Sequence, residues 1–377
     1  MNIIKGHIVD VINKRIFKGE IHFTNKIEKI IEKPVDEEQY ILPGLVNAHV
    51  HIESSMLSPL SFSKYAIKHG TVAVVTDPHE IANVCGEQGL EYMIENANLS
   101  PLKIYFGVPS CVPATSFVTS GSLLDSAVVE RLIASNNYIM LSEMMNFPGV
   151  VYDDPEVWAK INAAKKFAKP IDGHAPQLSG NNLKKYVVDA GISTDHECST
   201  LEEALEKIAL GMKIQIREGS AAKNFNTLRH LIDTHPDKIM FCTDDTHPDD
   251  LLEGHINVIV KHAWHLNYNY FDVLRAATVN PVRHYNLNVG LLQQGDCADF
   301  IVSDSQYLKK IKQVYINGLD ALNANFSNND LKYINHWNPS ILKKEDLEFK
   351  QTQHSLNGLG CIDGELWRQE VTVRDCD

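Results

Sequence analysis

The chain has 377 residues, of which 44% are hydrophobic and 22% charged, as expected for a globular protein with one large and one small domain. Its formal net charge of −13 argues against nucleic acid as the main partner, because binding a phosphate backbone requires a basic face. The apolar runs are too short for a membrane helix, and seven scattered cysteines without a Cys-x-x-Cys pair predict reduced thiols in the cytoplasm.

The first 40 residues have the pattern of short strands. The segments IIKGHIVDVI, FKGEIHFT and KIEKIIEKP alternate in polarity and are separated by turns at Gly19 and near Asn25. They are too few to fold alone. Near the other end of the chain, ADFIVSD and IKQVYING also read as strands. The two ends are therefore predicted to build one small β-domain.

Between the two ends, apolar strands and helical segments follow one another. The helices have clear start signals, namely Ser58-Pro59, Asp154-Pro155, and the capping box formed by Thr200 and Glu203. Eight strands, nearly all separated by helices, favour a (β/α)8 barrel over an open doubly wound sheet. No glycine-rich dinucleotide or phosphate-binding motif follows any strand. The predicted strands are residues 45–51, 71–77, 104–108, 138–143, 170–174, 191–196, 212–217 and 238–244.

Metal-type ligands recur at the ends of these strands, where barrel enzymes place their active sites. His49 and His51 project from one face of the first strand, because residues two apart in a strand point the same way. A lone histidine is more often a core residue than a ligand, but a set of six on five strands is hard to explain that way. Imidazole and carboxylate without thiolate suit Zn, Mn or Fe(II). The other members of the set are Glu143, His174, His196 and Asp244.

The sequence resembles the amidohydrolase superfamily and, within it, the bacterial adenine deaminase family. The resemblance covers roughly residues 40–305 and rests on PGLVNAHVHIESSM, VVTDPHEIANVCG, LSEMMNFPGV, DGHAPQLSG, GISTDHECSTLEEA, IREGSAAKN, CTDDTHPDDLLEGHIN and GLLQQGDCADFIVSD. It implies an α/β fold with a TIM-type catalytic barrel and a small β-sandwich assembled from both chain ends. The implied boundaries are 1–42 and 291–325 for the sandwich, 43–290 for the barrel, and 326–377 for a tail, which could be a remnant of a further domain.

The resemblance also implies a site and a reaction. His49 and His51 would bind one divalent metal, and His174 and His196 a second. Glu143 would bridge the two metals, and Asp244 would complete the set of ligands around the first metal and act as general acid/base. The ions would be Mn or Fe(II) in preference to Zn, and the reaction would convert adenine to hypoxanthine and ammonia in purine salvage. The implied partner is a small purine; a homo-oligomer is left open.

Other polar residues near the strand ends could contact substrate or support the ligands. Alternation along the last strand predicts that Asp245 points away from Asp244. The substrate candidates are Asp77, His79, Glu80, Arg217, Glu218 and Ser220.

Other functions are compatible with parts of the same residue set. His51-Ile52-Glu53 matches half of the zinc nucleoside-deaminase signature, but no Pro-Cys-x-x-Cys follows. A single-metal cytosine or guanine deaminase would carry His-x-Asp-Glu where this chain has His174-Ala-Pro. Relatives acting on cyclic amides or other nucleobases stay open. Family members usually continue for over a hundred residues more, so a truncated, metal-binding protein with little activity is a further alternative.

Overall fold

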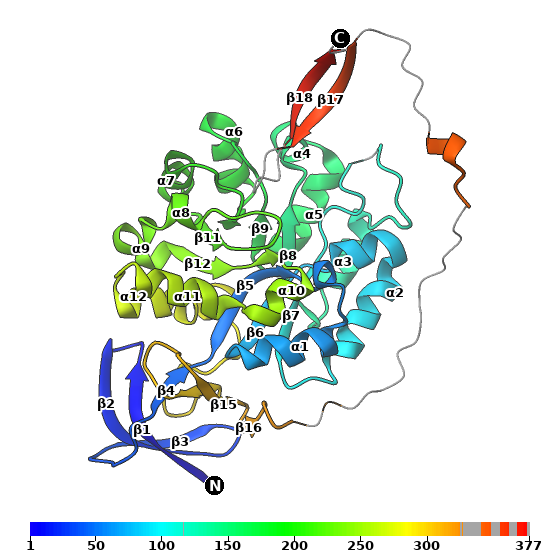
Figure 1. Cartoon of the computed structure of the whole chain (residues 1–377). Helices are drawn as coiled ribbons and strands as arrows, with labels where there is room; N and C mark the ends of the chain where they lie inside the picture. Colours follow the sequence, from blue (N-terminus) through cyan, green and yellow to red (C-terminus); the bar gives the residue numbers. More distant parts are fainter. Residues whose placement is uncertain (116, 325, 327–340, 348–354, 362–367, 375–377) are drawn as a thin grey trace.

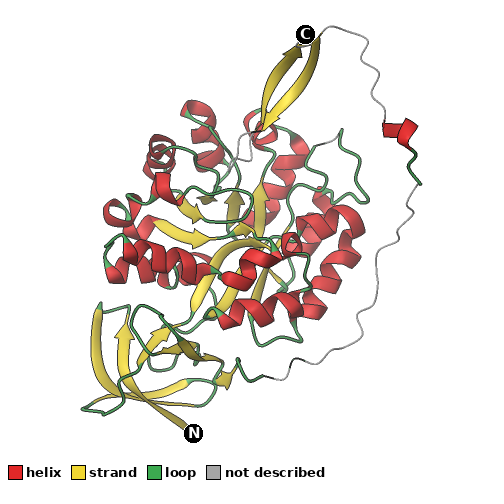
Figure 2. Ribbon diagram, viewed as in Figure 1, coloured by secondary structure: helices red, strands yellow, loops and turns green. Residues whose placement is uncertain are grey.

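A barrel of parallel strands surrounded by helices forms the centre of the molecule, and a small sheet lies at one end of it (Figures 1 and 2). The computed structural model describes residues 1–115, 117–324, 326, 341–347, 355–361 and 368–374. Within these residues, every helix is too short or too polar to cross a bilayer. Part of the tail predicted at 326–377 lies outside the described residues.

The bounds of the elements are as follows. The strands are β1 Asn2–Asp10, β2 Arg15–Phe23, β3 Ile27–Glu32, β4 Tyr40–Pro43, β5 Leu45–His51, β6 Thr71–Thr76, β7 Lys103–Val108, β8 Tyr138–Met144, β9 Ile171–Gly173, β10 Thr194–Asp195, β11 Lys213–Arg217, β12 Ile239–Cys242, β13 Asp244–Asp245, β14 Phe300–Ser303, β15 Ile311–Ile316, β16 Leu319–Asp320, β17 Ser355–Cys361 and β18 Arg368–Arg374. The helices are α1 Pro59–Lys68, α2 His79–Ala97, α3 Ser126–Ile133, α4 Phe147–Val151, α5 Pro155–Lys166, α6 Gly180–Lys184, α7 Leu201–Ala209, α8 Phe225–Leu228, α9 Leu231–Thr234, α10 Pro248–Glu253, α11 Ile256–His265, α12 Tyr270–Ala276 and α13 Val279–Tyr285. Short turns of helix in the described residues are η1 Ile52–Ser55, η2 Lys185–Asp189, η3 Pro236–Lys238 and η4 Lys344–Leu347.

The predicted barrel is confirmed. Strands β5 to β9 form one parallel run and β10 to β12 a second. A backbone hydrogen bond of 2.9 Å from Ser193 to Ile171 joins the two runs, and β13 closes the ring by pairing with β5. Because all the strands are parallel, their carboxyl ends meet at one rim of the barrel.

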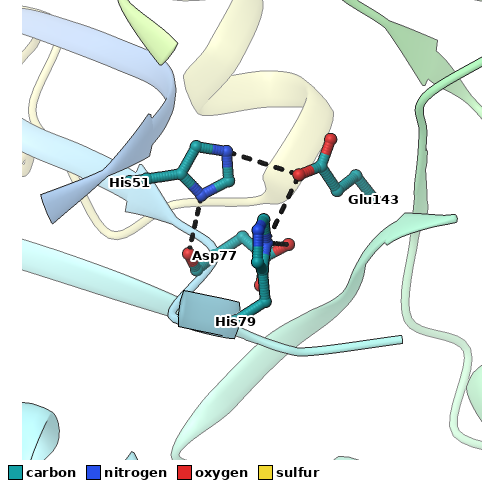
Figure 3. A group of neighbouring side chains, drawn as sticks. All are labelled: His51, Asp77, His79 and Glu143. Atoms are coloured by element: carbon teal, nitrogen blue, oxygen red, sulfur yellow. Dashed lines mark hydrogen bonds and ion pairs between the residues drawn. The ribbon is translucent and has the colours of Figure 1, made fainter. Parts of the chain in front are cut away.

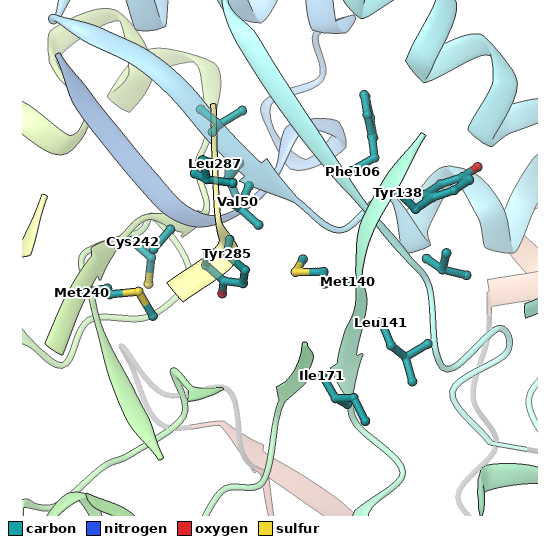
Figure 4. Packing of buried hydrophobic residues seen from close by; sticks show 14 of the residues in the cluster. Val50, Phe106, Tyr138, Met140, Leu141, Ile171, Met240, Cys242, Tyr285 and Leu287 are labelled. Carbon is teal, nitrogen blue, oxygen red and sulfur yellow. The ribbon is translucent and has the colours of Figure 1, made fainter. Parts of the chain in front are cut away.

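The barrel interior is a packed core and not a channel. Every residue of β5, β6 and β12 is buried, as expected for parallel strands covered on both faces. Figure 4 shows Val50, Met140 and Cys242 from three different strands in one hydrophobic cluster with Tyr285 of α13. The Tyr285 hydroxyl donates to Asp172 at 2.7 Å. The core therefore fills the barrel and leaves the rim for polar side chains.

Both ends of the chain contribute to the small sheet, as predicted. Its strand order among the described residues is β16-β15-β14-β4-β1-β2-β3. Phe23 on β2 lies edge-on against Phe300 on β14 with ring centroids 5.1 Å apart, although two strands separate them in the sheet. Flat strands that far apart would be about 14 Å from each other at the usual spacing. The single sheet therefore curls over its own core, much as a sandwich encloses one.

Helix α5 begins where its capping signal predicts. The Asp154 carboxylate accepts hydrogen bonds from the backbone of Glu156 at 2.9 Å and of Val157 at 3.3 Å. We expect Asp154→Ala to lower the free energy of unfolding by about 1 kcal/mol, the usual loss for an aspartate cap. Asp154→Asn is the matched control, since asparagine caps equally well. Equal thermal unfolding temperatures for the alanine variant and the wild type would contradict the prediction.

Candidate metal centre

All six predicted ligands meet at the carboxyl rim of the barrel. His49 and His51 come from β5, and Glu143 from β8. His174 and His196 directly follow β9 and β10, and Asp244 begins β13. They surround a small cavity of about 150 Å³. The cavity is lined by His51, His79, Glu80, Glu143, Met145, His174, His196, Asp244 and Asp245, with His49 completely buried behind them.

One group of ligand atoms consists of His49, His51 and Asp244. The Nε2 atoms of the two histidines are 3.1 Å apart. The Oδ1 atom of Asp244 lies 3.1 Å from Nε2 of His51 and 3.5 Å from Nε2 of His49. Nδ1 of His51 faces the carbonyl oxygen of Asp77 at 2.9 Å, which fixes the proton on that nitrogen and leaves the lone pair of Nε2 directed into the group.

The second group contains His174 and His196, and Glu143 lies between the two groups. Oε2 of Glu143 is 2.8 Å from Nδ1 of His174 and 3.2 Å from Nε2 of His196. Its other oxygen, Oε1, is 3.3 Å from Nε2 of His51. Each oxygen of this one carboxylate thus faces a different group, which is the arrangement expected of a bridging ligand.

The electrostatics of the rim suit a bound cation. Burial, and then the neighbouring His196, lower the pKa of His49 to about 4, so this imidazole is neutral and keeps a lone pair. Burial also disfavours the charged form of His51, but the carboxylates of Glu80 and Asp244 outweigh it and raise the pKa of His51 well above its ordinary value. Carboxylates that favour a proton on Nε2 of His51 would equally favour a metal cation in the place of that proton.

The residues present fit divalent metal ions. The donors are imidazole nitrogens and carboxylate oxygens, the set that Zn, Mn and Fe(II) share. Groups of these donors close enough to hold an ion include His49 with His51 and Asp244, and His49 with Glu143 and His196. Histidine nitrogens that converge beside buried carboxylates are explained by a cation at their centre.

Of the six substrate candidates, Asp77, His79 and Glu80 lie at this rim. Figure 3 shows His79 between Asp77 and Glu143, with His51 beside them. Nδ1 of His79 is 3.1 Å from Oδ2 of Asp77 and 3.4 Å from Oε1 of Glu143. Burial opposes protonation, but Asp77 outweighs it and raises the pKa of His79 to about 10. His79 and Glu80 also line the cavity.

The structure places the other three candidates away from the cavity. Arg217 is 3% exposed and lies behind Asp244, where Nη1 donates to Oδ2 of Asp244 at 2.6 Å and also pairs with Glu197. Glu218 and Ser220 line a neighbouring hollow of about 170 Å³ beside α10 and α11. Arg217 is therefore placed to orient Asp244.

The expectation that Asp245 points away from the site is wrong. Asp245 lines the same cavity as Asp244 and groups with His51 and Glu80. The reason lies in the backbone, because Asp244 has a φ of 56° and breaks the alternation of an extended strand.

Glu197 is a residue of this rim that the sequence did not lead us to predict. Its Oε1 lies 3.3 Å from Nε2 of His196. The sequence signal that could have indicated Glu197 is its position directly after His196, a predicted ligand.

The chain is similar to known proteins over most of its length. The Amidohydrolase family profile matches residues 40–321, which include all six predicted ligands. The chain is 58% identical over 315 residues to a protein named adenine deaminase from Methanosarcina mazei, covering 83% of this chain and 57% of that protein. It is 47% identical over 374 residues to a protein of the same name from Parabacteroides distasonis, covering 98% and 68%.

Solved structures share the fold at low sequence identity. N-acetyl-D-glucosamine-6-phosphate deacetylase from Mycobacterium smegmatis matches with a TM-score of 0.62 at 12% identity, covering 85% of this chain and 99% of that one. A beta-aspartyl dipeptidase from Fervidobacterium islandicum gives 0.61 at 18% identity, covering 86% and 100%. The chain spans only 57% of the length of the Methanosarcina mazei relative. The family profile nevertheless covers most of the chain and contains its entire candidate metal centre, so the protein belongs to the amidohydrolase family.

Proposed function

We propose that the protein is a metal-dependent aminohydrolase that converts adenine and water to hypoxanthine and ammonia. The observation that carries the proposal is the position of Glu143, whose two oxygens face two groups of histidines at one cavity. The similarity to proteins named adenine deaminase supports adenine as the substrate.

The six predicted ligands would bind two metal ions. His49, His51 and Asp244 would hold one metal, His174 and His196 the other, with Glu143 between them. When bound, divalent metals make water available as a nucleophile near neutral pH. Five of these six ligands are at most 3% exposed, and His174 is the one whose side chain is partly exposed, at 24%.

Asp244 would move the proton. Burial opposes its ionisation, but His49, His51 and Arg217 outweigh this effect and hold its pKa well below the usual range, so it is a carboxylate at neutral pH. It would accept a proton from the water that attacks C6 of the purine. It would then return that proton to the exocyclic nitrogen, which leaves as ammonia.

The remaining residues would recognise the base. His79 and Glu80 would contact the purine, since both line the cavity, and Asp77 would orient His79. Arg217 would hold Asp244 in place, whereas Glu218 and Ser220 line the neighbouring hollow. We assign Mn or Fe(II) as the working metal, a role in purine salvage, and the cytoplasm as the location.

The proposal is tested by ammonia release. The chain, supplied with Mn, Fe(II) or Zn, is incubated with adenine, adenosine, guanine and cytosine in parallel. We expect ammonia and hypoxanthine from adenine, with little turnover of the other three. Turnover of another base without turnover of adenine would replace the assignment. Binding of two metals without ammonia release from any substrate would favour a metal-binding protein without this activity.

A further inference from the structure

Lys207 on α7 is a completely buried lysine close to the metal centre. Its Nζ donates to Oε1 of Glu203 at 2.7 Å and to the carbonyl oxygen of Ala175 at 2.8 Å, and it lies 3.2 Å from Oδ2 of Asp195. From sequence alone, Glu203 and Lys207 would be an ordinary surface pair four residues apart on a helix. Burying this charge is costly unless it is fully paired. Here the ammonium group has three oxygen atoms around it, one for each of its N–H donors.

The partners of Lys207 hold the two loops that carry His174 and His196. Oδ2 of Asp195 accepts a hydrogen bond of 3.0 Å from the backbone of Ala175, the residue after His174. Oδ1 accepts one of 2.7 Å from the backbone of Glu197, the residue after His196. A single aspartate side chain thus fixes the backbone beside both histidines.

Glu203 makes a second connection between the same loops. Its Oε1 accepts a hydrogen bond of 2.8 Å from the backbone of Gln177, and its Oε2 one of 3.0 Å from the backbone of Ser199. Lys207 joins Glu203 to Asp195 and is a shared counter-ion for the two carboxylates. Burial opposes the lysine charge, but Asp195 outweighs it and raises the pKa of Lys207 above its ordinary value, so the lysine is charged when it holds the two carboxylates.

We propose that Lys207 is a positioning residue for His174 and His196 and sets the affinity of the metal that these two histidines would bind. The inference rests on the proposed two-metal site. The other group takes its position from a different part of the fold, because β13 pairs Asp244 with Val50 of β5. Loss of Lys207 should therefore weaken one metal and spare the other.

The test is a calorimetric titration of the full chain with Mn²⁺ after removal of bound metal by a chelator. The wild type should bind two tight equivalents. In Lys207→Met, which keeps most of the side-chain volume, we expect one tight equivalent to remain and the other to weaken by about 10–100-fold, the usual loss for a group that supports a ligand. Asp195→Asn should give the same selective loss, since an asparagine cannot accept from both Ala175 and Glu197 through two oxygens.

Lys103→Met is the matched control, because it also removes a lysine that pairs with a buried aspartate. Nζ of Lys103 lies 2.6 Å from Oδ2 of the buried Asp299, at the start of β7 and thus at the opposite end of the barrel from the metal centre. This variant should unfold at a lower temperature but bind both equivalents. If Lys207→Met does not fold, Asp195→Asn decides the question.

Three results would go against the inference in distinguishable ways. Two unchanged tight equivalents in Lys207→Met, or in Asp195→Asn where the lysine variant does not fold, would exclude the positioning role. Equal weakening of both equivalents would make the effect a general loss of stability. Fewer than two tight equivalents in the wild type would overturn the two-metal site itself, and the inference with it.

Discussion

Replacing Asp244 with asparagine is expected to lower the turnover of adenine by about 10²–10⁴-fold, the usual contribution of a positioned acid/base. The asparagine is nearly isosteric, so the fold should be retained. It cannot accept the proton that the carboxylate of Asp244 would carry between water and the leaving nitrogen. The loss should therefore appear mainly in kcat and not in KM.

The neighbours of Asp244 determine how an asparagine side chain would be oriented at this position. Nη1 of Arg217 donates to Oδ2 of Asp244, and Nε2 of His51 lies 3.1 Å from Oδ1. An asparagine would keep its carbonyl oxygen toward the arginine, because two donors cannot face each other, and would turn its NH₂ group toward the histidines. We therefore expect some loss of the first metal as well, and turnover must be expressed per bound metal.

Two further variants separate the possible outcomes. Asp249→Asn, on the exposed start of α10, should behave like the wild type in both turnover and metal content. Asp245→Asn is the critical comparison, because Asp245 lines the same cavity. If Asp245→Asn abolishes turnover while Asp244→Asn retains it, the proton carrier is Asp245.

The barrel and the convergence of the six predicted ligands could be predicted from sequence because both depend on periodicity. Parallel strands are buried on both faces and read as apolar runs, so their ends could be located within a few residues. Polar side chains at those ends must meet at one rim whatever the loops do. The two-residue repeat of β5 was enough to predict that His49 and His51 lie on the same face of the strand.

The features that sequence analysis missed depend on loop conformation, which no repeat encodes. The positive φ of Asp244 turns Asp245 into the cavity, against the alternation of an extended strand. The short strands β9 and β10 end before His174 and His196, so the contacts of Glu197 follow from loops. Lys207 is completely buried, and its Nζ donates to the carbonyl oxygen of Ala175 in one of those loops.

Replacing Glu143 with glutamine should lower the metal content from about two per chain to about one, because the anionic bridge between the two sites is lost. Burial opposes the ionisation of Glu143, but His174 and the other histidines outweigh it and hold its pKa well below the usual range. The glutamine has nearly the same volume but carries no charge and only one acceptor atom, so it can face one group of histidines and not both.

Elemental analysis of the purified variant measures the number of metal ions per chain. Glu53→Gln is the matched control. Burial, and then the nearby Glu80, raise the pKa of Glu53 to about 8, so at pH 7 this side chain is mainly neutral already and glutamine resembles it closely. Glu53→Gln should therefore keep both metals while Glu143→Gln loses one. If Glu143→Gln keeps both, another carboxylate bridges the sites, and Glu197, 3.3 Å from Nε2 of His196 and 3.7 Å from Nδ1 of His174, is the residue to replace next.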